Sequence, residues 1–439
     1  MNTSRRSFIK QSSAAVIGAS LLPGSAAGKQ ELEAAVGPVN AFGDGTIRLA
    51  LIGCGGRGTG AAWQALSTAG DVKLVAMADA FSDRLEDSLG QLSGAFPERV
   101  EVPEENRFTG FDAYERAIAA GVDMVILTTP PGFRPIHFEA AVAAGKHVFM
   151  EKPVAVDANG IQRVLAAARK ADVAGLKVGV GLQRRHQDRY LQGVERIKDG
   201  AIGELTLLRC YWNGAGVWVR PREAAQTEMT YQMRNWYYFN WLCGDHITEQ
   251  HIHNLDVCNW LAGGFPVSAQ GQGGRQVRTG LDHGEIFDHH MVEYTYASGL
   301  KMISQCRHIP GTWSSVNEYA HGTHGTADMG NASIQSTGGW KWRFREDEPN
   351  PYQVEHDDLF AAIRGGTPYN EAEYGAKSTM TSILGRMATY SGNTVMWDDA
   401  INSGQDLSPA HYDFEAEPPV LPDADGRYAI PTPGETPPY

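Results

Sequence analysis

Short apolar runs alternate with amphipathic segments through the first part of the chain. The apolar runs predict buried strands, which we place at residues 47–52, 72–78, 123–127, 146–150 and 177–180. The segments between them carry apolar residues at helical spacing and predict helices at residues 59–69, 113–120, 136–144 and 161–170. Strands that alternate with helices are typical of a parallel sheet covered by helices on both faces. We therefore expect an α/β domain over residues 46–182.

The pattern changes after Glu204, where longer segments alternate apolar and polar residues. The clearest of them places four residues on one side of a strand: His290, Val292, Tyr294 and Tyr296. Such alternation predicts a sheet with one covered face, and helical patterns at residues 245–261 and 374–390 supply the cover. We therefore expect residues 183–416 to form a second α/β domain, built on a large, mostly antiparallel, open-faced sheet.

The last segment, residues 417–439, holds seven prolines. Proline has no backbone N–H and a fixed φ, so this segment is neither a helix nor a central strand. It predicts an extended C-terminal arm that lies over a neighbour.

The first 27 residues have the features of a transport signal. Residues 4–10 read SRRSFIK, which matches the twin-arginine pattern, and a mildly apolar stretch comes next at residues 14–22. This stretch is too short to span a bilayer. Small residues at 25–27 suit a signal peptidase. We expect a signal peptide at residues 1–27, a linker at 28–45, and a protein exported to the periplasm without a stable membrane anchor.

Composition narrows the functional class. The formal net charge of −13 and the absence of a basic stripe after the signal argue against a nucleic-acid partner. The five cysteines are odd in number and show no paired spacing, so neither a disulfide framework nor a zinc site is indicated. A hydrophobic share of 42% is ordinary for a globular enzyme.

A glycine-rich turn comes directly after the first predicted strand and opens the first predicted helix. Its residues are Gly53, Cys54, Gly55, Gly56, Arg57 and Gly58. This is the context of the Rossmann dinucleotide fingerprint, in which backbone amides approach the pyrophosphate. Asp79 ends the second strand, where a carboxylate accepts hydrogen bonds from the adenosine ribose and repels a 2′-phosphate. The sequence predicts NAD rather than NADP, a preference that Arg84 softens.

Two further segments resemble one family. The first segment, residues 147–153, reads HVFMEKP and comes directly after Ala144, Gly145 and Lys146. The second consists of residues 179–185 together with 200–204, which resemble a junction between two domains. Together with the glycine motif, they resemble the Gfo/Idh/MocA oxidoreductases over residues 47–397. The resemblance implies an NAD(P)-dependent sugar or polyol oxidoreductase that is generally metal-free. We assign Thr129, Pro130, Glu151 and Lys152 to the cofactor site on this basis.

Three residues are candidates for the chemistry. Lys152 lies just past the end of a parallel strand, where a cation can stabilise a developing alkoxide. On the helix predicted at 245–261, Glu249 and His253 share a face at i and i+4 spacing. The resemblance implies that His253 is the general base, although the family's usual residue at position 249 is aspartate. A histidine oriented by a carboxylate is a competent base at neutral pH.

Aromatic residues gather ahead of this helix and favour a carbohydrate substrate, because sugar rings stack on aromatic planes. We assign four residues to the substrate: Arg184, Arg234, Trp236 and Asp256. A metal site is a further alternative, since His246 shares a face with Glu249 and His253 and residues 282–290 are rich in potential ligands. Nothing in the spacing fixes a metal, and we predict none.

The leading hypothesis is hydride transfer between a sugar or polyol hydroxyl and tightly bound NAD in a redox-neutral cycle. A glycoside hydrolase or lyase that acts by transient oxidation and elimination is the alternative, and a non-catalytic sugar-binding sensor is a third. The open sheet face and the proline-rich arm predict a homo-oligomer, a dimer or tetramer.

Overall fold

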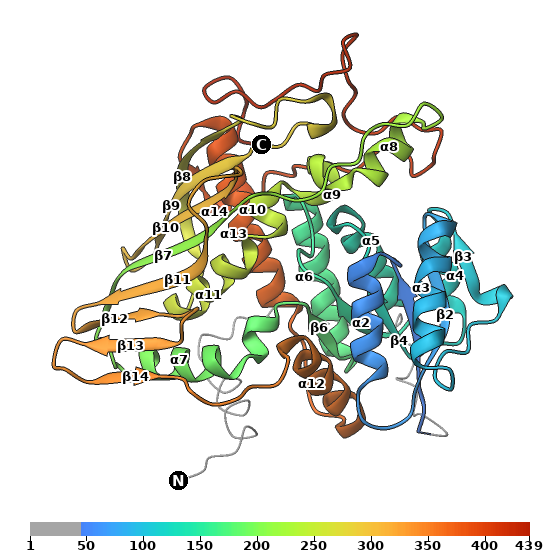
Figure 1. The fold of residues 1–439 in the computed structure, drawn as a ribbon, viewed down its shortest axis with the longest axis horizontal. Coiled ribbons are helices and arrows are strands. Elements are labelled where there is room, and N and C mark those ends of the chain that lie inside the picture. Colours follow the sequence, from blue (N-terminus) through green and yellow to red (C-terminus); the bar gives the residue numbers. More distant parts are fainter. Residues whose placement is uncertain (1–44) are drawn as a thin grey trace, which may run out of the picture. The chain divides into compact units, whose positions relative to one another are not determined.

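The first domain is a doubly wound parallel sheet. The computed structural model describes residues 45–439, so the twin-arginine segment and almost all of the predicted linker lie outside the described residues. Sheet A has six strands in the order β3-β2-β1-β4-β5-β6 (Figure 1). They are β1 (Ile47–Ile52), β2 (Val72–Asp79), β3 (Arg107–Thr109), β4 (Met124–Leu127), β5 (His147–Met150) and β6 (Val178–Val180). All five predicted strands are present, and β3 is an addition.

Helices cover both faces of sheet A, as the sequence predicts. On one face lie α2 (Gly56–Leu66) and α3 (Ser82–Ala95). On the other lie α4 (Ala113–Ala119), α5 (Arg134–Ala143) and α6 (Ala158–Val173). Alternate residues of β1 enter different cores: Leu49 and Leu51 face α2, whereas Ala50 and Ile52 face the other layer. Burial on both faces explains why this strand reads as a continuous apolar run.

A helix from the far part of the sequence returns to the first domain. In α12 (Pro351–Gly365), the residues Leu359, Phe360 and Ile363 join the core on the α2 face. The sequence pattern does not predict α12, and nothing in its local composition marks its packing partner. The first domain therefore depends on residues beyond its predicted boundary at 182.

The second domain contains a nine-stranded, mostly antiparallel sheet B, which confirms the predicted fold class. Its strands are β7 (Leu205–Gly214), β8 (Pro266–Gly274), β9 (His289–Tyr296), β10 (Lys301–His308), β11 (Ser315–Gly322), β12 (Gly325–Asp328), β13 (Ser333–Ser336), β14 (Lys341–Arg343) and β15 (Val395–Met396). The pair β7 and β10 is parallel. Helices α11 (Ile252–Ala262) and α13 (Ala372–Ser391) pack on one face (Figure 1). In β9, His290, Val292, Tyr294 and Tyr296 are buried, as the alternation predicts.

The helix predicted at 245–261 is divided in two, which corrects the sequence-based expectation. Helix α10 (His246–Glu249) ends before α11 begins. Between them the amide of His251 donates to the backbone oxygen of His246 at 3.3 Å, five residues back. Such a π-type turn inserts one residue into the helical ladder and rotates the phase of the residues after it. Glu249 and His253 are therefore not related by regular i and i+4 helical spacing.

The C-terminal arm, residues 417–439, contains no helix or strand, as its prolines predict. It packs on its own chain, against α8 (Glu228–Arg234). Gln232 donates to the backbone oxygen of Val420 at 2.7 Å, and Tyr428 is buried beside Glu228 and Arg222. Further helices are α7 (Asp188–Lys198), α9 (Asn240–Cys243) and α14 (Trp397–Ile401). Among residues 45–439, none of the helices combines the length and apolar character needed to cross a membrane.

Candidate active site

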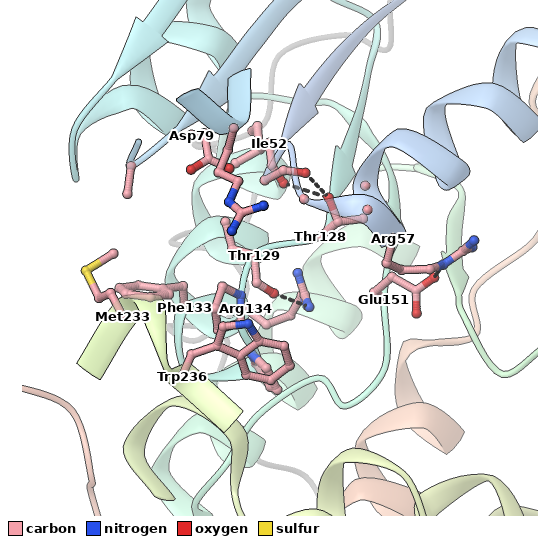
Figure 2. Close-up of a pocket in the computed structure, with 18 of the residues that line it drawn as sticks. Ile52, Arg57, Asp79, Thr128, Thr129, Phe133, Arg134, Glu151, Met233 and Trp236 are labelled. Carbon is pink, nitrogen blue, oxygen red and sulfur yellow. Dashed lines mark hydrogen bonds and ion pairs between the residues drawn. The ribbon is translucent and has the colours of Figure 1, made fainter. Parts of the chain in front are cut away.

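A cavity of about 600 Å³ lies at the carboxyl ends of β1, β4 and β5, where the second domain faces the first (Figure 2). Open α/β sheets bind their ligands at this edge. Most of the residues assigned from the sequence line this cavity: Gly53, Gly55, Gly56, Arg57, Gly58, Asp79, Thr129, Pro130, Glu151, Lys152, Arg234, Trp236, Glu249 and His253. The structure thus brings the glycine loop and the candidate chemical groups into one space.

The glycine loop has the geometry of a dinucleotide cradle. Gly53 has φ +97°, and a Cβ on Gly58 would approach the backbone oxygen of Gly53 to 1.9 Å, so neither position accepts a side chain without rearrangement. At Gly55 and Gly56, by contrast, a Cβ would meet nothing within 4 Å. These two residues leave open space in front of the backbone at the start of α2, where a pyrophosphate fits.

Asp79 ties the loop to the end of β2. One carboxylate oxygen accepts from the amide of Cys54 at 2.6 Å, and the other accepts from the amide of Phe81 at 2.9 Å. Burial raises the pKa of Asp79, and the two amides oppose that shift by favouring the charged form. Each oxygen keeps a second lone pair, so the carboxylate can hold the loop and still accept from a ribose hydroxyl.

Lys152 and Glu249 meet across the boundary between the domains. The Lys152 Nζ donates to the backbone oxygen of Glu249 at 2.6 Å and to its Oε1 at 3.1 Å. Both side chains are largely buried, at 13% and 15% exposure. Lys152 therefore pairs with Glu249 rather than with the adjacent Glu151. This contact fixes the ammonium group at the cavity wall.

His253 lies beside this pair and is buried, with the ring of Trp212 stacked at 6.0 Å between centroids. Burial lowers the pKa of His253 well below its usual value, and the positive charges of Lys152, Arg184 and Arg57 lower it further. Its Nδ1 has no hydrogen-bond partner among the described residues. A neutral imidazole with an available nitrogen is suited to accept a proton from a bound hydroxyl group.

Glu151, directly before Lys152, also lines the cavity. Burial alone would raise its pKa, but Arg57, Lys152 and Arg134 hold the pKa below the usual value. Arg57 donates to the Glu151 carboxylate and lies over the ring of Tyr352, which also lines the cavity. The carboxylate is therefore ionised and paired.

Two of the four residues assigned to the substrate line the cavity. Arg234 forms a bidentate ion pair with Asp83, with both distances at 2.7 Å, and its guanidinium lies 3.7 Å from the ring centre of Phe81. This pair joins α8 of the second domain to α3 of the first, at the Asp79 end of the cavity. Trp236 lies near the rim, 5.9 Å from the ring of Trp218.

The other two residues, Arg184 and Asp256, do not line the cavity. Arg184 pairs with the buried Glu318. Asp256 accepts two hydrogen bonds from Arg185, at 2.8 and 2.9 Å, and one from Ser378 at 2.7 Å. These contacts join α11 to its neighbours and leave the carboxylate occupied.

Of the candidate metal ligands, His246 and His290 converge with Asp245, whereas Glu249 and His253 do not join them. His246 turns away from Glu249 and His253 into a buried cluster with Asp245 and His290. Asp245 accepts from the ring of His246 at 2.6 Å, from Tyr390 at 2.5 Å and from the amide of Phe287 at 2.9 Å. Protein donors already occupy this carboxylate, whereas the Nε2 of His246 has no hydrogen-bond partner among the described residues. Residues 282–290 do not line the cavity either.

Trp212 and Trp218, two of the aromatic residues that gather ahead of the helix, also line the cavity. Several other cavity residues are not evident from the sequence, among them Arg134, Gln250 and Tyr352. Arg134 could have been found, because it comes after a turn rich in proline and glycine that directly follows a predicted strand, at the edge where ligands bind. Tyr352 is brought in from α12 by tertiary packing, which no local pattern reports.

Comparisons with known proteins agree with this geometry. Residues 47–180 match GFO_IDH_MocA, an oxidoreductase family with an NAD-binding Rossmann fold, and residues 190–328 match the GFO/IDH/MocA C-terminal domain. The inositol 2-dehydrogenase of Rhizobium meliloti is 28% identical over 258 residues, which span 59% of this chain and 68% of that enzyme. The inositol 2-dehydrogenase of Klebsiella pneumoniae is 35% identical over 153 residues, which span 34% of this chain and only 38% of that enzyme.

Two crystal structures show a similar fold. The scyllo-inositol dehydrogenase of Lactobacillus casei with bound NAD(H) and scyllo-inositol has a TM-score of 0.61 at 20% identity, covering 80% of this chain and 99% of that one. The aldose-aldose oxidoreductase of Caulobacter crescentus, complexed with glycerol, has a TM-score of 0.62 at 19% identity with the same coverage. At this level of identity the comparison supports the architecture.

Asp79 sets the first prediction. Asp79→Ala removes a hydrogen-bond acceptor for the adenosine ribose and a negative charge that repels a 2′-phosphate. The affinity for NAD should therefore fall about tenfold or more, and the difference between the affinities for NAD and NADP should become smaller. Fluorescence titration with NADH and NADPH measures both. Asp87→Asn removes an exposed negative charge from α3, the next helix along the chain, and should change neither affinity. Tighter binding of NADPH than NADH by the unaltered protein would refute the assigned role.

His253 sets the second prediction. A general base must be deprotonated to act, and the lowered pKa of His253 keeps its imidazole neutral. We therefore expect kcat/KM for oxidation to fall only when the pH is below the ordinary histidine pKa of about 6.5. Lys152→Met removes a neighbouring positive charge, so the acid limb of the residual activity should move to higher pH. Steady-state pH profiles test this. An unaltered protein that loses activity with a midpoint at or above 6.5 would contradict it.

Proposed function

Since the chain belongs to the Gfo/Idh/MocA family of NAD-binding oxidoreductases, we propose that it transfers a hydride between a hydroxyl-bearing carbon of a sugar or polyol and bound NAD. The observation that carries this proposal is the convergence of Lys152 and His253 on a cavity continuous with the glycine loop. The named relatives, which include inositol 2-dehydrogenases, support the substrate class.

The chain's own residues supply the proton handling. NAD, when bound, supplies the hydride acceptor. His253 accepts the proton of the substrate hydroxyl, while the Lys152 ammonium stabilises the negative charge that develops on the oxygen. Glu249 positions Lys152 through its backbone oxygen and carboxylate. Trp212 and the surrounding walls limit access of water to these groups.

We further propose that the cofactor is retained through a redox-neutral cycle. Beyond the inner membrane little free NAD is expected, and the predicted twin-arginine signal would deliver a folded protein there. The ion pair between Arg234 and Asp83 supports retention, because it bridges the two domains beside the adenosine end of the cavity. Hydride taken from one molecule would then return to another sugar or to the same molecule.

A second candidate is glycoside cleavage by transient oxidation, favoured by the exposed Trp218 at the cavity rim, where a second ring can stack. Oxidation of a ring hydroxyl acidifies the neighbouring C–H, the glycosidic group leaves by elimination, water adds, and the hydride returns. The proton and hydride are both restored, so no net NADH forms. Product analysis after incubation with glycosides and no added cofactor separates the two candidates.

We also propose that the protein is a homo-oligomer. The face of sheet B opposite α11 and α13 supports this, because no helix packs on it within residues 45–439 (Figure 1). Closed symmetric assembly is the common way to cover such a face. The arm adds no support, since it packs on its own chain.

The third prediction concerns the two chemical groups. Lys152→Ala and His253→Ala should each lower turnover by about 10² to 10⁴-fold while NADH binding and the melting temperature change little. Steady-state assays on inositols, aldoses and glycosides measure the loss. Lys377→Ala removes an exposed lysine paired with Glu373 outside the cavity and serves as the control. Near-normal turnover in either cavity variant would remove that residue from the mechanism.

The fourth prediction concerns retention. Protein purified without added cofactor should contain bound NAD(H), which is released on denaturation and assayed in the supernatant. Arg234→Ala, Asp83→Ala and the double variant should each raise the NADH release rate about two- to fivefold, the range for a partly exposed pair. The double variant should equal either single one, because both remove the same contact. Cofactor-free protein that turns over only with stoichiometric soluble NAD would overturn retention.

A further inference from the structure

Arg134 is a fully buried cation inside the cavity, with 1% of its surface exposed. It begins α5, directly after the turn that comes after β4. Its Nη2 donates to the backbone oxygen of Thr129 at 2.7 Å, and Figure 2 shows the side chain reaching that oxygen. Its Nε and Nη1 are buried and have no hydrogen-bond partner among the described residues. Two donors of a buried guanidinium are thus available.

The surrounding charges leave this cation without a partner of its own. Glu151 is the carboxylate whose charge acts on Arg134, but it is already hydrogen-bonded to Arg57. Lys152 pairs with Glu249, and Arg57 also lies 3.5 Å from a carboxylate oxygen of Glu355. Arg57 and Lys152 thus each have a carboxylate within ion-pair distance, whereas Arg134 forms no ion pair with any of the described residues.

Such an arrangement is costly in the absence of a ligand. A buried charge without a counter-ion is strongly destabilising, and the positive end of the α5 dipole adds to the cost at Arg134. The contact with a single backbone oxygen compensates only part of it. A ligand that brings an oxyanion would supply both the missing charge and acceptors for the two N–H groups.

The position of Arg134 indicates which ligand supplies the oxyanion. The pyrophosphate is expected at the loop after β1, where Gly55 and Gly56 open onto the cavity. Arg134 instead lies after β4 and acts on Glu151 at the end of β5, on the side of Lys152 and His253. Arg134 therefore comes from the loop beside the strand that carries Glu151 and Lys152, and we place it in the half of the cavity that receives the substrate.

We propose that Arg134 binds a carboxylate of the substrate, so that the preferred substrate is a sugar acid or a glycoside that carries a carboxylate. This inference rests on the proposed sugar or polyol oxidoreductase function and narrows its substrate class. Nη1 and the second proton of Nη2 form a fork that matches the two oxygens of a carboxylate, which a lysine ammonium does not. Arg134 acts here as a specificity-determining residue, and the proton chemistry stays with Lys152 and His253.

The test compares matched ligands that differ in one carboxylate. Calorimetric binding of glucose and glucuronate, galactose and galacturonate, and their methyl glycosides is measured on the NADH-loaded protein. The unaltered protein should bind at least one acid about tenfold or more tightly than its neutral partner. Arg134→Met should abolish that preference and leave the affinity of the neutral sugar unchanged, and Arg134→Lys should retain part of it. Arg222→Met removes a cation outside the cavity and should keep the preference.

A second measurement separates binding from a structural role. If Arg134 serves a ligand, the melting temperature of cofactor-free Arg134→Met should equal or exceed that of the unaltered protein, because an unpaired buried charge is removed. A lower melting temperature together with an unchanged acid preference would overturn the proposal. So would weaker NADH binding by Arg134→Met with an unchanged acid preference, since the oxyanion would then belong to the cofactor.

The outcome is distinguishable from failure of the proposed function, because binding is measured without turnover. The protein could prefer acids through Arg134 and yet oxidise none of them. That result would support the carboxylate site and contradict the proposed oxidoreductase activity. If the protein oxidises neutral sugars and shows no preference for acids, the proposed activity stands and the proposed carboxylate site is wrong.

Discussion

The contact between Lys152 and Glu249 is the constraint on which the active site depends. Lys152 lies just after β5 of the first domain and Glu249 ends α10 of the second, so their hydrogen bonds fix the distance between the two halves of the cavity. Both groups are largely withdrawn from water, where an ion pair is favourable only if its partners are held in good geometry. His253 lies at the start of α11, just past the break after α10, and its position depends on the same helix end.

That helix end is held in turn by a buried polar network. Asp245, with a φ of 69°, precedes α10 and accepts hydrogen bonds from His246 and Tyr390. On the other side, Gln250 meets His308 at 2.8 Å, and Arg278 donates to His308 at 2.6 Å. These contacts rigidify their surroundings, because breaking any one of them leaves a further buried polar group without a partner. They explain how a strained backbone and an irregular helix persist next to the reacting groups.

The sequence is informative where local pattern and tertiary role coincide. The strands of sheet A read as apolar runs because both faces are buried, and the glycine loop is recognisable because its backbone must approach a ligand. The break between α10 and α11 is not predictable, since the residues around His251 keep helical spacing and the network that breaks the helix is built from distant strands. Arg184 and Asp256 look like functional residues in the sequence, but their partners Glu318 and Arg185 come from elsewhere in the fold.

Aromatic residues that line the cavity are backed by residues far along the sequence. Phe414 packs on Phe81 and Phe111 at its adenosine end, and Tyr428 donates to Glu228 of α8. The ribosome makes these residues long after it has made the strands of sheet A. A nascent chain therefore lacks this backing at its nucleotide cleft until those residues emerge, so sheet A alone does not complete the adenosine end.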